Sequence, residues 1–229
     1  MDLYRYLSRE EWLSAIECRH SVRKFTEEKL KEEQIARLTE MIGEINREYG
    51  LHVQLLTDEP DAFRAGKPSY GAFSGCRNYI AMVGRKGEDE AIGYTGEALV
   101  LLARHLGLGS CWVALTFDHG GVKADIEKGE KLYDLIALGF GQTDGAPHRS
   151  KAPESLYTAG APAPDWFLAG VRAASLAPTA INQQKFRFDL VGERSVRAKH
   201  FFGPCAKTDL GIVKLHFALA AGEGNFDFV

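Results

Sequence analysis

A short segment near the N-terminus places four potentially cationic side chains and one hydroxyl within six residues. Its sequence is Arg19-His20-Ser21-Val22-Arg23-Lys24, followed by Phe25. In an extended chain Arg19, Ser21 and Arg23 share one face, and Val22 points to the other. Two guanidinium groups beside a hydroxyl can hold a phosphate monoester, because arginine offers planar, paired donors. On charge pattern alone, a solvated basic surface also explains these residues.

A second candidate stretch lies where an apolar helix is predicted to end. It reads Ala173-Ala174-Ser175-Leu176-Ala177-Pro178-Thr179-Ala180-Ile181-Asn182-Gln183-Gln184. Proline stops a helix and fixes φ, and the amide of Asn182 offers both a donor and an acceptor. A plain Pro-Thr turn is the alternative interpretation.

Two further stretches could contribute to the same site. Gly107-Leu108-Gly109-Ser110 leads into Cys111-Trp112-Val113-Ala114-Leu115, and its glycines permit close approach of the backbone to a ligand. A helix end followed by a core strand explains that pattern equally well. The basic pair Arg149 and Lys151 stands between prolines, and alone it is typical of a solvated surface.

The elements that must position these residues follow from hydrophobic spacing. Ser8 and Glu11 have the spacing of a capping box, which predicts a helix from there to Cys18. Helical periodicity predicts further helices over residues 34–49, 93–106, 165–176 and 209–221. Alternating or continuous apolar runs predict strands over residues 52–56, 79–83, 111–115, 135–141 and 186–191. The sequence therefore predicts a mixture of helices and strands.

The C-terminal part repeats features of the N-terminal part. The helix and strand of residues 165–191 repeat the order of residues 34–56. The helix of residues 209–221 ends in glycines at the same offsets as residues 93–109. Two duplicated blocks in one order indicate an internal pseudo-twofold, although a chance match of apolar helices ending in glycine remains the alternative. We expect a first half over residues 1–157, a linker over 158–164, and a degenerate second half over 165–229.

Composition narrows the function classes. The 229 residues are 45% hydrophobic and 26% charged, with a formal net charge of −3, which is ordinary for a globular chain. This charge gives no case for nucleic acid or membrane binding, and no apolar run could span a bilayer. The N-terminus lacks an apolar signal core, so we expect a cytoplasmic location. Dispersed cysteines and histidines predict reduced structural thiols and no metal site.

Together the motifs resemble the nitroreductase family of FMN-dependent NAD(P)H oxidoreductases. R-H-S-V-R-K-F resembles the family's flavin-phosphate segment, and A-P-T-A-I-N-Q-Q resembles its motif A-P-S-x-x-N-x-Q-P-W, with Lys185-Phe186 in place of Pro-Trp. The resemblance extends from about Ser14 to Phe226. It implies an α+β, nitroreductase-like fold with mixed β-sheets flanked by helices. Within the family, this sequence is similar to the branch that fuses two degenerate halves into an internal pseudo-dimer.

The resemblance also implies site residues. Those expected at the phosphate and ribityl chain of FMN are Arg19, His20, Ser21, Arg23, Arg149 and Lys151. Backbone amides near Ala114 and Leu115 are expected to donate toward the reactive edge of the flavin. Those expected to line the ring from the second half are Pro178, Thr179, Ala180 and Asn182. A weaker candidate for the pyrimidine side is residues 67–71.

The expected activity is hydride transfer from NADH or NADPH to FMN and then to a small-molecule acceptor, such as a nitroaromatic or a quinone. No residue is singled out as a general acid or base, so the chemistry is expected to be that of FMN. We expect a monomer with one complete site. The alternatives are a flavin-binding module for storage or sensing without reductase activity, and a colourless interaction domain. No G-x-S-x-G, Walker or Rossmann fingerprint supports another enzyme class.

Overall fold

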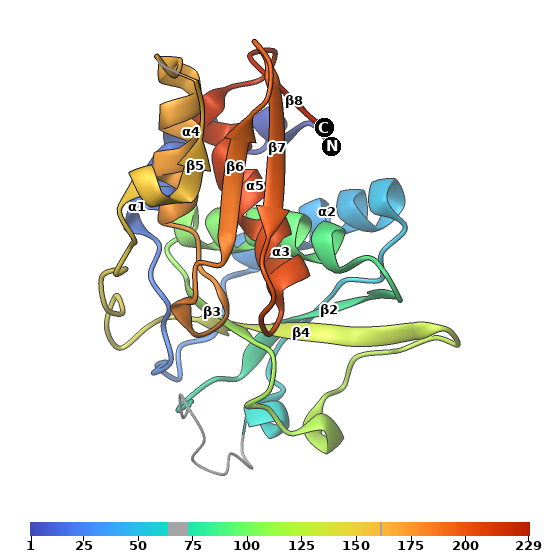
Figure 1. Ribbon diagram of the computed structural model, residues 1–229. Helices are drawn as coiled ribbons and strands as arrows, with labels where there is room; N and C mark the ends of the chain where they lie inside the picture. Colours follow the sequence, from blue (N-terminus) through green and yellow to red (C-terminus); the bar gives the residue numbers. More distant parts are fainter. Residues whose placement is uncertain (64–72, 161) are drawn as a thin grey trace.

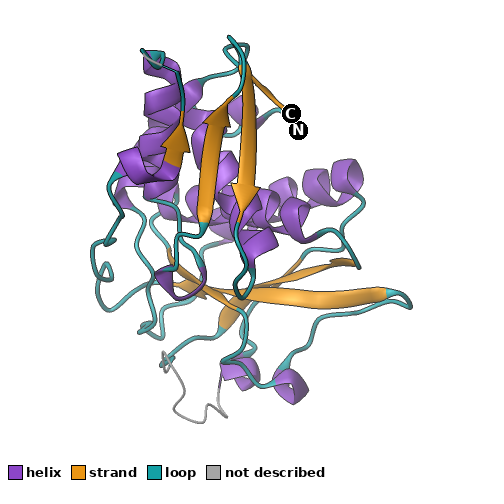
Figure 2. Cartoon of the chain, viewed as in Figure 1, coloured by secondary structure: helices purple, strands orange, loops and turns teal. Residues whose placement is uncertain are grey.

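The computed structural model describes residues 1–63, 73–160 and 162–229. These parts of the chain form five α-helices and two four-stranded β-sheets, which Figures 1 and 2 show with the helices gathered between and beside the sheets. The predicted α+β class is therefore confirmed. No helix in the described ranges is long and apolar enough to cross a membrane. The weaker candidate segment, residues 67–71, lies outside the described residues.

The first sheet is antiparallel throughout, in the order β1-β2-β4-β3. Its strands are β1 (Gln54–Leu56), β2 (Asn78–Arg85), β3 (Gly109–Val113) and β4 (Glu130–Gly139). The two central strands, β2 and β4, carry almost continuous apolar runs because both faces of the sheet are covered. β4 begins five residues before the predicted apolar strand, since its first part is only partly buried and carries charged side chains.

The second sheet is mixed, in the order β5-β6-β7-β8. Its strands are β5 (Tyr157–Thr158), β6 (Phe186–Leu190), β7 (Ser195–His200) and β8 (Asp227–Phe228). β6 and β7 are antiparallel, whereas the two outer pairs are parallel. Figure 1 shows this sheet running across the direction of the first. The sequence did not predict β7, because its residues are mostly polar and Val196 is its one fully buried side chain.

The helices are α1 (Arg9–Cys18), α2 (Glu32–Tyr49), α3 (Asp89–His105), α4 (Asp165–Ser175) and α5 (Ala206–Ala221). Each helix begins and ends within three residues of its predicted limits, apart from α3. That helix begins at Asp89, four residues before its predicted start, because its first turn is polar. The predicted capping box of α1 is confirmed, since Ser8 Oγ accepts from the Glu11 amide at 3.2 Å and the Glu11 carboxylate accepts from the Ser8 amide at 2.7 Å. Gly50, with φ of 66°, ends α2 as predicted.

Helices α3 and α5 pack against each other at the centre of the molecule. A Cβ added at Gly93 would lie 1.9 Å from the carbonyl oxygen of Thr208, and one added at Gly211 would lie 2.0 Å from that of Glu90. Only glycine permits this approach of the two backbones. The close contact brings α5, which lies in the C-terminal part of the chain, against the elements of the N-terminal part.

Three groups of buried side chains form the core. One joins α1, α2 and α3 to a face of the first sheet, and a second joins α4, α5 and the second sheet. The third covers the other face of the first sheet and includes Val22 and Phe25. Trp112 packs against both of the first two groups and so bridges them. The first sheet is antiparallel, whereas the second is mixed. Thr158, the first residue of the predicted linker, pairs with Asp189 in the second sheet. The duplicated halves and their limits at residues 157 and 165 therefore stay predictions.

Candidate active site

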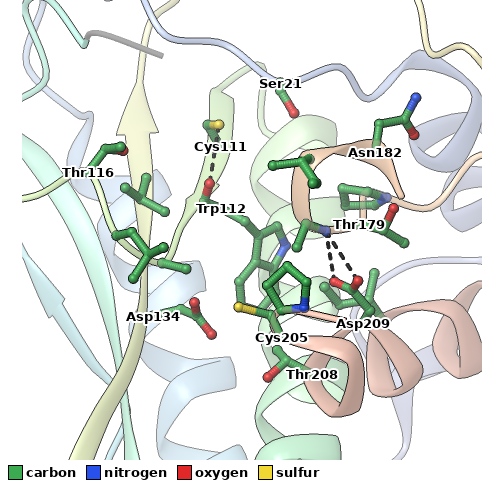
Figure 3. Close-up of a pocket in the computed structure, with 18 of the residues that line it drawn as sticks. Ser21, Cys111, Trp112, Thr116, Asp134, Thr179, Asn182, Cys205, Thr208 and Asp209 are labelled. Carbon is green, nitrogen blue, oxygen red and sulfur yellow. Dashed lines mark hydrogen bonds between the residues drawn. The ribbon is translucent and has the colours of Figure 1, made fainter. Parts of the chain in front are cut away.

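A cavity of about 310 Å³ opens between the end of β3, the segment after α1, the loop after α4 and the first turn of α5 (Figure 3). It brings together most of the residues singled out in the sequence. The predicted site residues that line it are Arg19, Ser21, Arg23, Ala114, Leu115, Pro178, Thr179, Ala180 and Asn182. Three others do not line it, namely His20, Arg149 and Lys151. Segments far apart in the sequence therefore meet at one site.

The segment after α1 is extended, as predicted. The Val22 amide donates to the carbonyl of Ser110 at 2.9 Å, and Ser21 forms an isolated parallel bridge with the same residue. Val22 is buried against Gly109, where an added Cβ would lie 2.9 Å from the valine side chain. This packing fixes the segment along the edge of β3. Arg19, Ser21 and Arg23 then all reach the cavity.

One end of the cavity holds two buried side-chain nitrogens that have no hydrogen-bond partner among the described residues. Arg19 is only 4% exposed, and its Nε has no hydrogen-bond partner among the described residues. Its nearest acidic oxygen is Oε1 of Glu97, at 3.8 Å. Nε2 of His148 is likewise buried and unpartnered. Burial, followed by the positive charge of Arg19, lowers the pKa of His148. The buried guanidinium of Arg19, whose Nε has no acceptor, and the exposed Arg23 make this end suited to an anion.

A buried hydrogen-bond network supports this end from behind. Glu97 on α3 is fully buried and accepts from Trp112 Nε1 at 2.8 Å through one carboxylate oxygen. The other oxygen lies 2.9 Å from Nε2 of His216 on α5, and His216 Nδ1 lies 3.1 Å from the carbonyl oxygen of Ala173. Both ring nitrogens face acceptors, so a proton must lie between His216 and Glu97. The network ties α3, α5 and β3 together around Arg19.

The loop after α4 is strained and held by several hydrogen bonds. Ile181 and Asn182 have φ values of 48° and 54°, in the left-handed region that a β-branched residue rarely adopts. Asp209, in the first turn of α5, accepts from the Ala180 amide at 3.0 Å and from Gln183 Nε2 at 2.7 Å. A strained backbone persists only where its surroundings over-determine it, and such loops are concentrated at functional sites.

The side chain of Asn182 is used within this loop. Its Nδ2 donates to the carbonyl of Arg149 at 2.9 Å, and its Oδ1 accepts from Gln184 Nε2 at 2.9 Å. The ammonium of Lys151 donates to the backbone carbonyls of Gln183 and Gln184 at 3.0 and 2.9 Å. Both side chains therefore hold the loop in place. The predicted phosphate roles of Arg149 and Lys151 stay predictions.

His20 lies away from the cavity lining, with its Nδ1 3.2 Å from the carbonyl oxygen of Asp144. Ala114 and Leu115 follow the last paired residue of β3 and line the cavity. Within the described residues no backbone acceptor is recorded for either amide. The side chain of Leu115 is 83% exposed, which leaves an apolar rim at the cavity mouth. These amides can donate to a ligand in the cavity.

Sequence reasoning missed several residues that line the cavity, and those with titratable side chains are Asp134, His148, Cys205 and Asp209. Burial, followed by the nearby charge of Asp209, raises the pKa of Asp134 to about 7. Burial also raises the pKa of Asp209 to about 6, although its bonds to Gln183 and Ala180 act in the opposite direction. A lone aspartate inside the apolar strand β4 was the one available signal. His148 stands in the basic segment that drew attention to its neighbour Arg149.

Comparison with known proteins agrees with this fold. The family model described as "Putative TM nitroreductase" matches residues 11–221, which is most of the chain. No curated protein matches the chain.

Solved structures show the same fold at low sequence identity. The crystal structure of a "putative nitroreductase" from Thermotoga maritima is similar with a TM-score of 0.64 at 22% identity, over 91% of this chain and 82% of that one. The crystal structure of a "putative NADH dehydrogenase/NAD(P)H nitroreductase" from Parabacteroides distasonis is similar with a TM-score of 0.51 at 18% identity, over 64% of this chain and 96% of that one. The extent of the family match shows that the chain belongs to the nitroreductase family.

Proposed function

We propose that this chain is an FMN-dependent oxidoreductase that transfers hydride from NADH or NADPH to a small-molecule acceptor, such as a quinone or a nitroaromatic. The observation that carries the proposal is the chemical division of the cavity. One end presents the guanidinium groups of Arg19 and Arg23, and the middle is apolar around Trp112 and Ile212. A phosphate-bearing planar ring needs both environments.

The phosphate end fits this chain's residues. A phosphate ester would provide an acceptor for the buried Nε of Arg19, and Ser21 beside it can donate a hydrogen bond from its hydroxyl. The phosphate would also offset the burial of the Arg19 guanidinium, which lowers the pKa of that group. The resemblance of the segment from Arg19 to Phe25 to the family's phosphate segment supports the same assignment.

The ring end fits as well. When bound, FMN would accept a hydride from the nicotinamide and deliver it to an acceptor. The amides of Ala114 and Leu115 would donate to the polar edge of the ring, and Pro178 and Ala180 would cover it. The hydrogen bonds to Asp209 hold that covering loop in one position. The chain's residues would thus bind and orient the FMN, and the loop would exclude water from the ring.

The colour of the purified protein tests this proposal. We expect the visible bands of an oxidised flavin, and release of FMN instead of FAD on denaturation, because the buried phosphate end leaves little room for an adenylate. Protein that stays colourless after incubation with FMN would contradict the proposal and favour an interaction domain. Flavin that binds but is never reduced by NAD(P)H would favour the storage or sensing module.

We also expect one FMN per chain and a monomer in solution. The cavity lining combines Arg19 and Ala114, from the predicted first half, with Pro178 and Asp209, from the predicted second half. One chain can therefore assemble one complete site without a partner. Light scattering combined with flavin quantitation measures both quantities. An obligate dimer that loses its flavin on dilution to monomer would show that the second half serves a neighbouring chain instead.

A further inference from the structure

One carboxyl group of the cavity has no partner among the described residues. Asp134 on β4 is 5% exposed and lines the cavity, and its carboxyl group makes no hydrogen bond or ion pair with any residue of the described chain. Asp209, the other carboxyl of the cavity, has its oxygens occupied by Ala180 and Gln183. Figure 3 shows the two carboxyl groups on opposite sides of Cys205. A buried carboxyl without donors is more stable with its proton than without it.

The charged groups around Asp134 keep the proton on it near neutral pH. Those that raise its pKa to about 7, after burial, are Asp209 on α5 and Asp89 on α3. Lys131, on the same strand, acts in the opposite direction. The thiol of Cys205 is partly buried, which raises its pKa to about 11, so it stays neutral beside Asp134. A carboxyl that can both hold and release a proton near neutral pH suits a general acid.

The strand register places Asp134 beside the reactive end of the proposed site. β3 pairs with β4 as far as Val113 and Leu135. The next two residues along these neighbouring strands are therefore Ala114, just after β3, and Asp134, within β4. Side chains alternate along a strand, so Asp134 shares the face of Ile136, which is paired with Trp112. The cavity thus has Asp134 next to the backbone that would face the hydride-donating edge of the ring.

We propose that Asp134 is a catalytic residue that donates the proton completing the reduction of a quinone-class acceptor. This inference rests on the proposed function. A quinone that takes up a hydride carries the two electrons and becomes an oxyanion. The carboxyl of Asp134 gives its proton to that oxygen, so a new O–H bond forms and Asp134 becomes a carboxylate. Solvent then returns a proton to the carboxylate. The balance is one NAD(P)H and one proton consumed for each quinone reduced to its hydroquinone.

The test is Asp134→Asn in the FMN-loaded protein, with Asp125→Asn in the exposed loop before β4 as the matched control. After reduction by NADH without oxygen, reoxidation by para-benzoquinone is followed at several pH values. We expect Asp134→Asn to slow this step by about 100-fold at pH 7. The wild-type and control rates should fall about tenfold per pH unit above the pKa of Asp134, whereas the variant rate should be flat. Ferricyanide takes electrons without a proton, so all three proteins should reduce it at similar rates.

A second measurement needs no flavin. In the flavin-free protein the melting temperature of the wild type, relative to Asp134→Asn, should fall as pH rises from about 4 to about 7. The reason is that the folded pKa is raised, so the protonated carboxyl stabilises the fold at low pH and this contribution is lost as pH rises. The control should follow the wild type.

The outcomes separate the two claims. Wild-type protein that binds no FMN, or is not reduced by NADH, would overturn the proposed function and this proposal with it. Wild-type protein that is reduced, with an Asp134→Asn variant that keeps the benzoquinone rate and its pH profile, would overturn this proposal alone. Equal slowing toward benzoquinone and ferricyanide would also overturn it, because a misplaced flavin and not a missing proton would then be the cause.

Discussion

Replacing Glu97 by alanine is expected to lower the free energy of unfolding by about 3–5 kcal/mol. The carboxylate of Glu97 is fully buried and accepts from Trp112, faces His216, and lies 3.8 Å from the guanidinium of Arg19. Its removal leaves the charge of Arg19 in the interior with no opposite charge. An uncompensated buried charge destabilises the folded state strongly. Urea unfolding followed by tryptophan fluorescence measures the loss.

The same helix supplies a control for this prediction. Glu90 on α3 pairs with Lys214 at 2.5 Å, but the glutamate side chain is 46% exposed. Glu90→Ala should cost no more than about 1 kcal/mol, because water screens an exposed pair. Glu97→Gln should fall between the two, since an amide oxygen can still accept from Trp112. If Glu97→Ala were no worse than Glu90→Ala, the buried network would not hold this region together.

Replacing Arg19 or Arg23 by alanine is expected to weaken FMN binding by roughly 10- to 100-fold each. A hydrogen bond to a charged group is worth roughly 1.5–3 kcal/mol, and each 1.4 kcal/mol is a factor of ten in affinity. Lys24 does not line the cavity, so Lys24→Ala should change the affinity little. Titration of the flavin-free proteins with FMN, followed by flavin fluorescence, gives the three constants.

The two arginines differ in what else they support. Arg19 is buried beside Glu97, so Arg19→Ala should also lower stability, whereas Arg23 is exposed and should leave stability nearly unchanged. Arg23→Ala therefore gives the cleaner measure of a phosphate contact. Equal losses of affinity in all three variants would indicate a general effect of surface charge and not a phosphate site.

Local signals in the sequence were enough for the helices. Ser8 and Glu11 specify the start of α1 by direct side-chain bonds, and Gly50 ends α2 by its left-handed conformation. Strand β7 could not be found in this way. Apart from Val196, its side chains are exposed or partly exposed, and its place is set by pairing with β6 and β8 in the folded chain.

The candidate site also combines residues that local sequence patterns indicated with residues whose place depends on tertiary contacts. Contiguous motifs pointed to the segment from Arg19 to Arg23 and to the loop from Pro178 to Asn182, and both line the cavity. Single residues such as Asp134 and His148 carry no local pattern, because their role arises from burial and from neighbours on other strands and helices. Lys151 likewise donates hydrogen bonds to backbone carbonyls more than 30 residues away in the sequence. Charge and spacing alone could not reveal these contacts.

The central claim is that this cavity binds an FMN that cycles between NAD(P)H and a small acceptor. The most direct measurement is the visible spectrum of the purified protein without oxygen, during titration with NADH or NADPH and then with a quinone. We predict that the flavin bands bleach with one equivalent of nicotinamide per flavin and return when the quinone is added. Bound flavin that keeps its colour under excess NADH and NADPH would contradict the claim.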